Sequence, residues 1–207
     1  VSAIYTCCKH LRHCIYIFQI WFMARKPEKR GGVKLIVLGG GCFWCTEAVF
    51  VRVEGVTGVV PGYAGGKIPN PTYEQVCGGK TGHAEVVRVE YDETKTTLEH
   101  LLHIFFATHD PTTLNRQGAD VGTEYRSIIL YSDEADEVKV QSVIRELQGK
   151  TDAHIVTEVA LLTDFYEAEA YHHNYFEQHP EQAYCQIVIN PKIDKLRAFL
   201  RTETNKT

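Results

Sequence analysis

The clearest chemical signal in this sequence is a pair of cysteines that follows three glycines. Cys42 and Cys45 lie in the stretch GGGCFWCTE, after the apolar run VKLIVL. This pattern predicts a short buried strand, a tight turn and an amphipathic helix near residues 43–53, with Cys42 where the helix begins. Unpaired N–H groups and the helix dipole favour an anion there, so we expect the pKa of the Cys42 thiol to be lowered. Cys42 is therefore a candidate nucleophile.

The two aromatic residues between the cysteines suggest a small apolar pocket. Phe43 and Trp44 are bulky for a turn, and the glycines before them let a ligand approach the backbone closely. Ordinary core packing is the alternative for these aromatics and for Cys45. Cys42 and Cys45 also form a CxxC pair, which occurs in redox dithiols and in zinc sites. The sequence has no second CxxC and no HExxH motif, so we do not expect zinc.

The composition of the chain indicates one globular domain. Of its 207 residues, 44% are hydrophobic and 23% are charged, which is typical of a protein with a substantial core. The formal net charge of -4 gives no electrostatic reason to expect nucleic acid as a partner. The seven cysteines are odd in number and unevenly spaced, unlike the disulfide framework of a small secreted domain. We therefore expect reduced thiols and a cytoplasmic location.

The N-terminal segment carries an apolar stretch at residues 15–22 between basic residues. This stretch is shorter than the roughly 20 residues that a membrane-spanning helix requires, so no stable membrane span is expected. It resembles a signal peptide but lacks an Ala-x-Ala-like site and has positive charge on its far side, which leaves export as an alternative. Met23, the only methionine, precedes the first strand. We predict that residues 1–32 are a non-catalytic extension and that residues 33–207 form a single catalytic domain.

Strands and helices alternate along the rest of the chain. Strands are predicted at residues 34–38, 56–63, 84–91, 126–131 and 154–162. Helices are predicted at residues 43–53, 97–110, 133–148 and 165–179, with a short terminal helix after an aperiodic tail. This order suggests an α+β two-layer sandwich, in which helices pack on a mixed sheet with a ferredoxin-like core. The glycines do not complete a GxGxxG motif, so nucleotide binding is not expected.

One acidic residue lies on an apolar strand face. Strict alternation in AEVVRVEY places Glu85 on the same face as Val87, Val89 and Tyr91. A carboxyl group on such a face loses hydration, which raises its pKa toward neutral pH. The alternative is a position at the rim of the strand.

Several segments of the chain resemble the peptide methionine sulfoxide reductase A family. They are GGGCFWCTEAVF, GVVPGYAGGKIPNPTYEQVCGGKTGHAEVVRVEYD, HDPTTLNRQGADVGTEYRSIIL and HHNYFEQHPEQAYC, in this order and with matching spacing. The resemblance runs from about Val33 to Pro191. It implies an oxidoreductase that reduces the S epimer of methionine sulfoxide, free or in oxidised proteins, and so repairs proteins after oxidative stress. Thioredoxin or another dithiol would be the reductant, and no metal or organic cofactor is expected.

The resemblance also implies roles for individual residues. The catalytic pair would be the nucleophile Cys42 and the general acid Glu85. The substrate-binding positions of the family are matched by Phe43, Trp44, Tyr73, Asp120 and Tyr125.

Sulfoxide chemistry supports these roles separately. A sulfoxide gives up its oxygen readily only when that oxygen is protonated while a thiolate attacks the sulfur, so a general acid is required. Tyr73 and Tyr125 bring phenolic donors from the loops at residues 64–83 and 115–125, which suits them to hold the oxygen. Simple packing of either tyrosine is the alternative, and Asp120 has the alternative of forming only a turn.

Attack by Cys42 leaves a sulfenic acid, which a second thiol must trap before it oxidises further. The resemblance points to Cys185, because HPEQAYC resembles the family's NPxGYC segment, and an aperiodic, mobile C-terminal segment would let it reach the site. Two departures leave this open. The glycine-rich stretch of many members is replaced by QIVINPKIDKLRAF, and Cys45 stands where many members carry glycine. Cys45 is the alternative resolving thiol if a disulfide to Cys42 is geometrically possible; Cys77 is interpreted as structural.

Two other classes of function compete with this interpretation. A thiol–disulfide oxidoreductase would use Cys42 and Cys45 as its own redox pair, although its helix normally carries Pro or Gly between the thiols. Metal or peptide binding through His172, His173 and His179 is weaker, because solvation of a surface helix explains these residues without a ligand.

Overall fold

The computed structural model describes residues 32–205. The predictions for residues 1–31, which include the apolar stretch at 15–22 and three of the cysteines, lie outside the described residues. Within the described range, no helix has both the length and the apolar character needed to cross a membrane.

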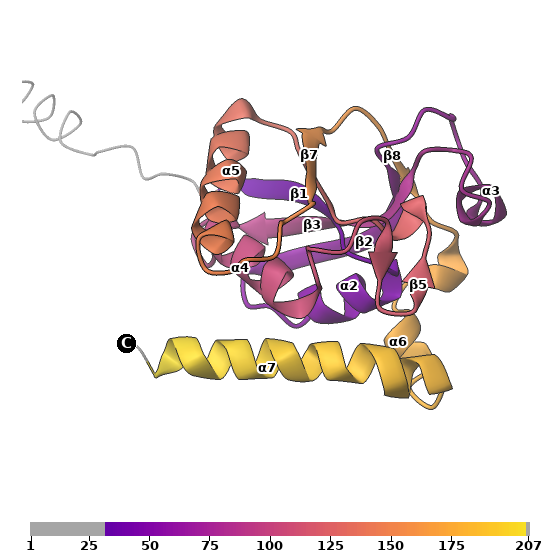
Figure 1. The fold of residues 1–207 in the computed structure, drawn as a ribbon. Helices are drawn as coiled ribbons and strands as arrows, with labels where there is room; N and C mark the ends of the chain where they lie inside the picture. The colour runs from indigo at the N-terminus through magenta and orange to yellow at the C-terminus, as the bar shows by residue number, and fades with distance from the viewer. Residues whose placement is uncertain (1–31, 206–207) are drawn as a thin grey trace, which may run out of the picture. The chain divides into compact units, whose positions relative to one another are not determined.

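The described residues form a mixed six-stranded sheet with the strand order β7-β6-β1-β3-β2-β8, and a separate two-stranded ribbon of β4 and β5 (Figure 1). Neighbouring strands are antiparallel except β6 and β7, which are parallel. The strands are β1 Val33–Gly39, β2 Val56–Ala64, β3 Ala84–Asp92, β4 Arg116–Gln117, β5 Asp120–Val121, β6 Ile128–Tyr131, β7 Glu158–Leu161 and β8 Phe165–Glu167. The mixed sheet and the α+β class are thus as predicted.

The buried hydrophobic residues form two clusters, and the helices pack against the sheet in the larger one. The α-helices are α2 Phe43–Phe50, α3 Tyr73–Cys77, α4 Leu98–Thr108, α5 Glu134–Gln148, α6 Tyr175–Gln178 and α7 Asn190–Thr204. Short turns are the 3-10 helices η1 Thr123–Tyr125 and η2 Ala170–His172, and the π-helical turn η3 Cys185–Ile189. Buried residues of α2, α4, α5 and α7 join one apolar cluster with the inner face of the sheet.

Strand β3 shows why the sheet has two different faces. Val87, Val89 and Tyr91 belong to the cluster beneath the helices, whereas Ala84 and Val86 belong to a smaller cluster on the opposite face. This is the alternation that the sequence predicts. It directs Glu85 toward the helical side, where α2 begins.

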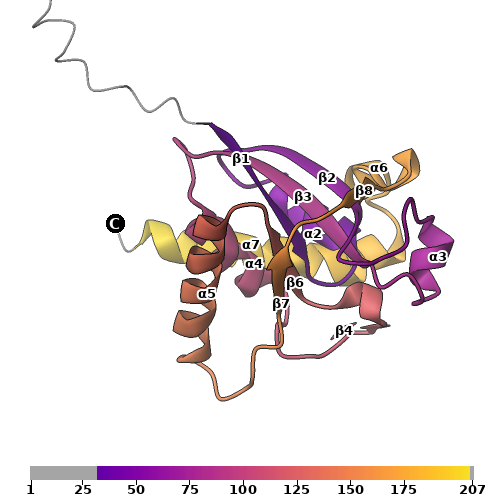
Figure 2. The ribbon, with the colours of Figure 1, turned by 90° about the horizontal axis from the view of Figure 1, so that it is seen from above.

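The sheet is strongly curled. Strand β7 ends at Leu161 and β8 begins at Phe165, although they lie at opposite edges of the sheet. Four Cα steps span at most about 14 Å, whereas a flat six-stranded sheet is about 24 Å wide. The connection passes over the face opposite α2 and α7 (Figure 2). Leu162 and Phe165 pack there on the smaller cluster and close its core.

The predicted helix at residues 165–179 is wrong. Residues Phe165–Glu167 instead pair with Gly62–Ala64 as an edge strand, which satisfies backbone groups that β2 would otherwise leave unpaired. Asn174 adopts a left-handed conformation with φ of 52°, so only the four residues of α6 remain α-helical. The tail is also more regular than predicted, because the turn η3 leads directly into the 15-residue helix α7.

Close packing of β2 against β8 generates a test of this edge pairing. A Cβ at Gly62 would lie 2.4 Å from the Phe165 ring and 2.5 Å from the Tyr166 carbonyl oxygen. We expect Gly62→Ala to lower the free energy of unfolding by about 1–3 kcal/mol, because overpacking forces these atoms apart. Gly58→Ala is the matched control, since its nearest neighbour is the movable Glu90 carboxylate at 3.2 Å. Equal losses in denaturant-induced unfolding of the two variants would contradict the close contact.

Candidate active site

The strand, turn and helix predicted around the cysteines are present. Strand β1 ends at Gly39, and Cys42 is the N-cap of α2. Gly41 has a φ of +95°, and a Cβ there would lie 2.6 Å from the side chain of Gln117. A Cβ at Gly40 would lie 2.9 Å from the Phe105 ring. The turn therefore depends on glycine, both for its conformation and for the space around it.

Glu85 faces the beginning of α2 and is 2% exposed. Its Oε2 accepts a hydrogen bond from the Phe43 N–H at 3.0 Å, and its carboxyl group also contacts the Cys42 thiol. Burial raises the pKa of Glu85 to about 8, although the hydrogen bond from Phe43 opposes the shift. At neutral pH the carboxyl group therefore carries a proton, as the strand pattern predicts.

Cys42 and Cys45 form a hydrogen-bonded pair at the start of α2. Burial raises the pKa of Cys42 well above its usual value, and the hydrogen bond to Cys45 raises it further. The pKa of Cys45 is lowered to about 7, chiefly by the hydrogen bond from Cys42, against the effect of burial and with a contribution from Lys192. The first proton lost by the pair therefore leaves Cys45.

The expectation of a lowered pKa at Cys42 is thus wrong for this state. The side chain of Cys42 makes no capping hydrogen bond to the helix. The first helical N–H, that of Phe43, is bound to Glu85, and the N–H of Cys45 is bound to the Cys42 carbonyl oxygen. These N–H groups are not directed at the sulfur, so the helix start does not offset the loss of hydration.

Tyr184 and Asp120 complete the polar surroundings of the two thiols. The Tyr184 hydroxyl donates a hydrogen bond to Asp120 Oδ2 at 2.8 Å, and its oxygen lies 3.9 Å from Cys45 Sγ. The Tyr184 ring packs edge-on against Trp44, with ring centroids 6.0 Å apart. Asp120, predicted as a site residue, is therefore hydrogen-bonded to a tyrosine next to the thiols that the sequence analysis did not identify.

An aromatic wall stands beside Cys42. The Trp44 indole stacks on Tyr175 with ring centroids 3.6 Å apart, and its Nε1–H donates to His172 Nδ1 at 3.1 Å. The Phe43 ring lies 6.5 Å from that of Tyr73 and 4.9 Å from that of His172. Because Nδ1 accepts a hydrogen bond, the neutral His172 ring carries its proton on Nε2. Phe43 and Trp44 thus form a wall with a fixed orientation.

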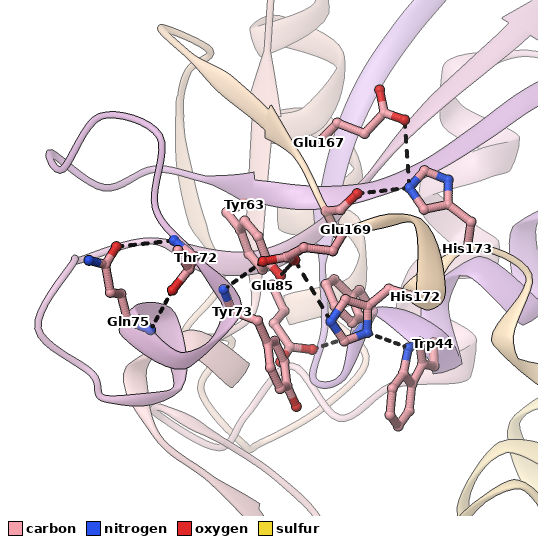
Figure 3. A network of polar contacts seen from close by, with 12 residues as sticks. Trp44, Tyr63, Thr72, Tyr73, Gln75, Glu85, Glu167, Glu169, His172 and His173 are labelled. Carbon is pink, nitrogen blue, oxygen red and sulfur yellow. Dashed lines mark hydrogen bonds and ion pairs between the residues drawn. The ribbon is translucent and has the colours of Figure 1, made fainter.

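Glu169 connects three residues that pack against this aromatic wall, namely Tyr63, Tyr73 and His172 (Figure 3). It accepts hydrogen bonds from the Tyr63 hydroxyl at 2.7 Å and from the Tyr73 N–H at 3.0 Å. Its Oε2 also lies 3.9 Å from Nε2 of His172. One carboxylate therefore ties the loop that carries Tyr73 to the segment that orients Trp44.

Tyr73 and Tyr125 both face Glu85. Burial is the main cause that raises the pKa of each phenol, and the charge of Glu85 contributes to both shifts. The Tyr73 hydroxyl is hydrogen-bonded to Cys77, which gives this exposed thiol a partner in the loop. Both phenols therefore remain protonated, and able to donate a hydrogen bond, across the neutral range.

The structure separates the predicted residues into two groups. The side chains that gather around the Cys42 sulfur or the Glu85 carboxyl group are Phe43, Trp44, Cys45, Tyr73, Asp120 and Tyr125. Cys185 is not among them, because it lies in η3 with no exposed surface and interacts with Cys45 rather than with Cys42 or Glu85. Residues that the sequence analysis missed as site residues are Tyr175, Tyr184, Glu169 and Lys192.

His172 corrects the interpretation of the histidine-rich segment. It is 1% exposed and belongs to the aromatic wall, so surface solvation does not explain it. In the part of the chain that the structure describes, no three His, Cys, Asp or Glu side chains are grouped as a metal site would require. The segment HHNYF could have predicted this contact, because a buried Trp needs a hydrogen-bond partner for its N–H and packs well on an aromatic ring, and the segment offers both.

Comparison with known proteins gives one consistent result. A family model described as peptide methionine sulfoxide reductase matches residues 34–204. A relative from Nautilia profundicola named peptide methionine sulfoxide reductase MsrA is 57% identical over 171 residues, which cover 83% of this chain and 98% of the relative. A relative of the same name from Sulfolobus acidocaldarius is 53% identical over 163 residues, or 79% of this chain and 93% of the relative.

Solved structures agree with these relatives. The reduced form of Mxr1 from Saccharomyces cerevisiae is similar with a TM-score of 0.71 and 37% identity, over 76% of this chain and 91% of that chain. The complex of Mxr1 with Trx2 is similar with a TM-score of 0.51 and 27% identity, over 73% of this chain and 91% of that chain.

The buried Glu85 gives the fold a specific pH dependence. Its pKa is raised from 4.5 to about 8 on folding. Its contribution to stability is therefore complete below the unfolded pKa and is lost as the pH rises through the folded pKa. Across this window the unaltered protein should lose unfolding free energy on the order of a few kcal/mol. We expect Glu85→Gln, which cannot ionise, not to show this loss. Unfolding free energies measured against pH test this, with Glu90→Gln on the same strand as the control. A pH dependence identical to that of the unaltered protein would rule out a buried, protonated Glu85.

Proposed function

The chain belongs to the peptide methionine sulfoxide reductase family, and we propose that Cys42 and Glu85 are the residues with which it carries out this reduction. The enzyme reduces methionine sulfoxide by thiol chemistry. The observation that carries the proposal is the contact between the buried, protonated carboxyl group of Glu85 and the Cys42 thiol. It supplies an acid and a nucleophile at one place, which is what oxygen transfer from sulfur to sulfur needs.

Substrate binding follows from the aromatic wall. We infer that the methyl group of the sulfoxide packs against Phe43 and Trp44, while the sulfoxide oxygen is held by the hydroxyls of Tyr73 and Tyr125. The raised pKa of each tyrosine keeps it a donor. A fixed wall on one side and donors on the other would distinguish the two configurations at sulfur, and the preference for the S epimer, free or in oxidised proteins, is proposed from the resemblance to the family.

The chemical step uses the proton of Glu85. The carboxyl group gives its proton to the sulfoxide oxygen while the Cys42 sulfur bonds to the substrate sulfur. The thiol proton of Cys42 passes along the existing hydrogen bond to the Cys45 thiolate. Transfer of the oxygen to Cys42 then releases methionine and leaves a sulfenic acid, and the substrate sulfur is reduced by the two electrons that Cys42 loses.

Cys45 is the favoured resolving thiol. It is already in hydrogen-bond contact with Cys42, and its pKa of about 7 makes part of it a thiolate at neutral pH. Residues three apart at a helix start have Cα atoms about 5 Å apart, which is within the range that a disulfide bridges. Cys185, the residue first expected in this role, is fully buried, and burial is the main cause that raises its pKa. Reaction of Cys185 as the first partner would need a rearrangement of η3.

Thioredoxin or a small dithiol would then reduce the disulfide. The similarity to Mxr1, which has been solved as a complex with Trx2, supports thioredoxin as the partner. Organic or metal cofactors have no step in this cycle. We also propose a reducing, cytoplasmic location, because the seven cysteines are odd in number and unevenly spaced.

The finer features of the architecture are also proposed. The order β6-β1-β3-β2, with α2 after β1 and α4 after β3, supports the proposal of a ferredoxin-like two-layer core with a split βαβ arrangement. Residues 33–207 would form the catalytic domain, and residues 1–32 would be an extension without a catalytic role. A mobile C-terminal segment around Cys185 remains a proposal that applies only if η3 opens.

Glu85→Gln tests the acid in the reaction itself. In single turnovers, the variant should release methionine at least about 100-fold more slowly at neutral pH, because the amide has no proton to give. The unaltered enzyme should lose rate as the pH rises through about 8, where Glu85 ionises. Rapid-quench measurement of methionine over a pH series gives both results. An unchanged rate in Glu85→Gln would remove Glu85 as the acid.

Two serine variants separate the candidate resolving thiols. We expect Cys45→Ser to release one equivalent of methionine and then stop in the presence of thioredoxin, because its sulfenic acid finds no partner. Cys185→Ser should continue to turn over. Cys42→Ser, which lacks the nucleophile, gives the background level of methionine release. Peptide mass mapping of the unaltered enzyme after one turnover should show a disulfide between Cys42 and Cys45. Continued cycling by Cys45→Ser together with arrest of Cys185→Ser would assign the role to Cys185.

A further inference from the structure

The C-terminal helix brings one positive charge to the dithiol. Lys192 of α7 donates to the Gly40 carbonyl oxygen, with Nζ at 3.5 Å, in the turn before Cys42. Lys192 and Cys45 line the same small hollow of about 10 Å³. No carboxylate among the described residues forms an ion pair with Lys192. Its ammonium group is therefore free to act on the thiols.

The π-helical turn η3 explains how Tyr184 and Lys192 can both reach the site. Tyr184 and Lys192 are eight residues apart, so an unbroken α-helix would direct them about 80° apart. The turn η3, at Cys185–Ile189, inserts an extra residue between them and brings them close to the same face. Accordingly, Tyr184 reaches Cys45 Sγ and Lys192 reaches the Gly40 carbonyl oxygen.

Lys192 is the one cation in the surroundings of Cys45. The titratable groups around this thiol are Cys42 of α2, Asp120 of β5, Tyr184 just before η3, Cys185 of η3, Lys192 of α7 and His109 at the end of α4. Asp120 disfavours a thiolate at Cys45, whereas Lys192 favours it. Burial lowers the pKa of His109 to about 4, so this ring is neutral at physiological pH. The hydrogen bonds from Cys42 and Tyr184 also favour the thiolate, and among the described groups that shift the pKa of Cys45, Lys192 is the only positive charge.

We propose that Lys192 is a positioning residue for the thiol chemistry, and that its ammonium group keeps Cys45 as the thiolate that resolves the Cys42 sulfenic acid. This inference rests on the proposed role of Cys45. In the step, the proton that Cys45 received from Cys42 passes to the Glu85 carboxylate, the Cys45 sulfur bonds to the Cys42 sulfur and the S–O bond of the sulfenic acid breaks. The departing hydroxide takes this proton from Glu85 and becomes water. When a dithiol later attacks the Cys42 sulfur, the same charge stabilises Cys45 as the leaving thiolate.

The test compares Lys192→Gln with Lys192→Arg and Lys195→Gln in the full-length, reduced protein. Glutamine keeps a donor for the Gly40 carbonyl oxygen and removes only the charge, arginine keeps the charge, and Lys195 is an exposed residue of the same helix. The ionisation of Cys45 is followed through its 13Cβ resonance in protein labelled at cysteine, assigned by its loss in Cys45→Ser. The rate of disulfide formation is measured separately, by mass spectrometry of acid-quenched samples after a single turnover with methionine sulfoxide.

We expect Lys192→Gln to raise the midpoint of Cys45 ionisation by about one pH unit and to slow disulfide formation several-fold at neutral pH, with recovery at alkaline pH. Lys192→Arg should restore much of both, and Lys195→Gln should change neither. A midpoint that is unchanged in Lys192→Gln would overturn the role of Lys192, even if Cys45→Ser fails to cycle. A shifted midpoint with normal cycling by Cys45→Ser would instead overturn the resolving role of Cys45.

Discussion

The site depends on one carboxyl group that is buried where a helix begins. Glu85 accepts the Phe43 N–H and is cut off from water, so it holds a proton at neutral pH. The same hydrogen bond takes the N–H that would otherwise stabilise an anion at Cys42. This contact places a protonated carboxyl group beside Cys42, whose thiol is kept protonated by burial and by the hydrogen bond to Cys45. The aromatic wall, the tyrosine donors and the second thiol are all arranged around this contact.

The fold assembles this contact from segments that are far apart in the sequence. The alternation of β3 directs Glu85 toward α2, and the antiparallel pairing of β1 with β3 brings the glycine turn alongside it. The curl of the sheet brings β8 onto the edge of β2, and the residues that follow β8 supply Glu169 and His172 behind the wall. The C-terminal helix adds Tyr184 and Lys192 on the remaining side. The second thiol, Cys45, is thereby enclosed by polar groups as well as by the core.

Local patterns in the sequence were enough to predict the centre of the site. The glycines before Cys42 and the alternation around Glu85 each express a physical requirement within a few residues, and the structure shows both as predicted. Residues 165–179 were assigned wrongly because an edge strand is defined by its partner, β2, which lies a hundred residues earlier. His172 and Lys192 were missed for the same reason, since their roles come from contacts across the fold. The pKa order of the two thiols could not be predicted either, because it depends on the burial of Cys42 and on the direction of the hydrogen bond between the two thiols.

The central claim is that Glu85 is a neutral carboxylic acid beside Cys42 at physiological pH. Infrared difference spectroscopy of the reduced enzyme against Glu85→Gln observes this group directly, through the C=O stretching band of a protonated carboxyl group. The account predicts that the band is present at neutral pH and disappears as the pH rises through about 8. A carboxylate spectrum for Glu85 at neutral pH would contradict it.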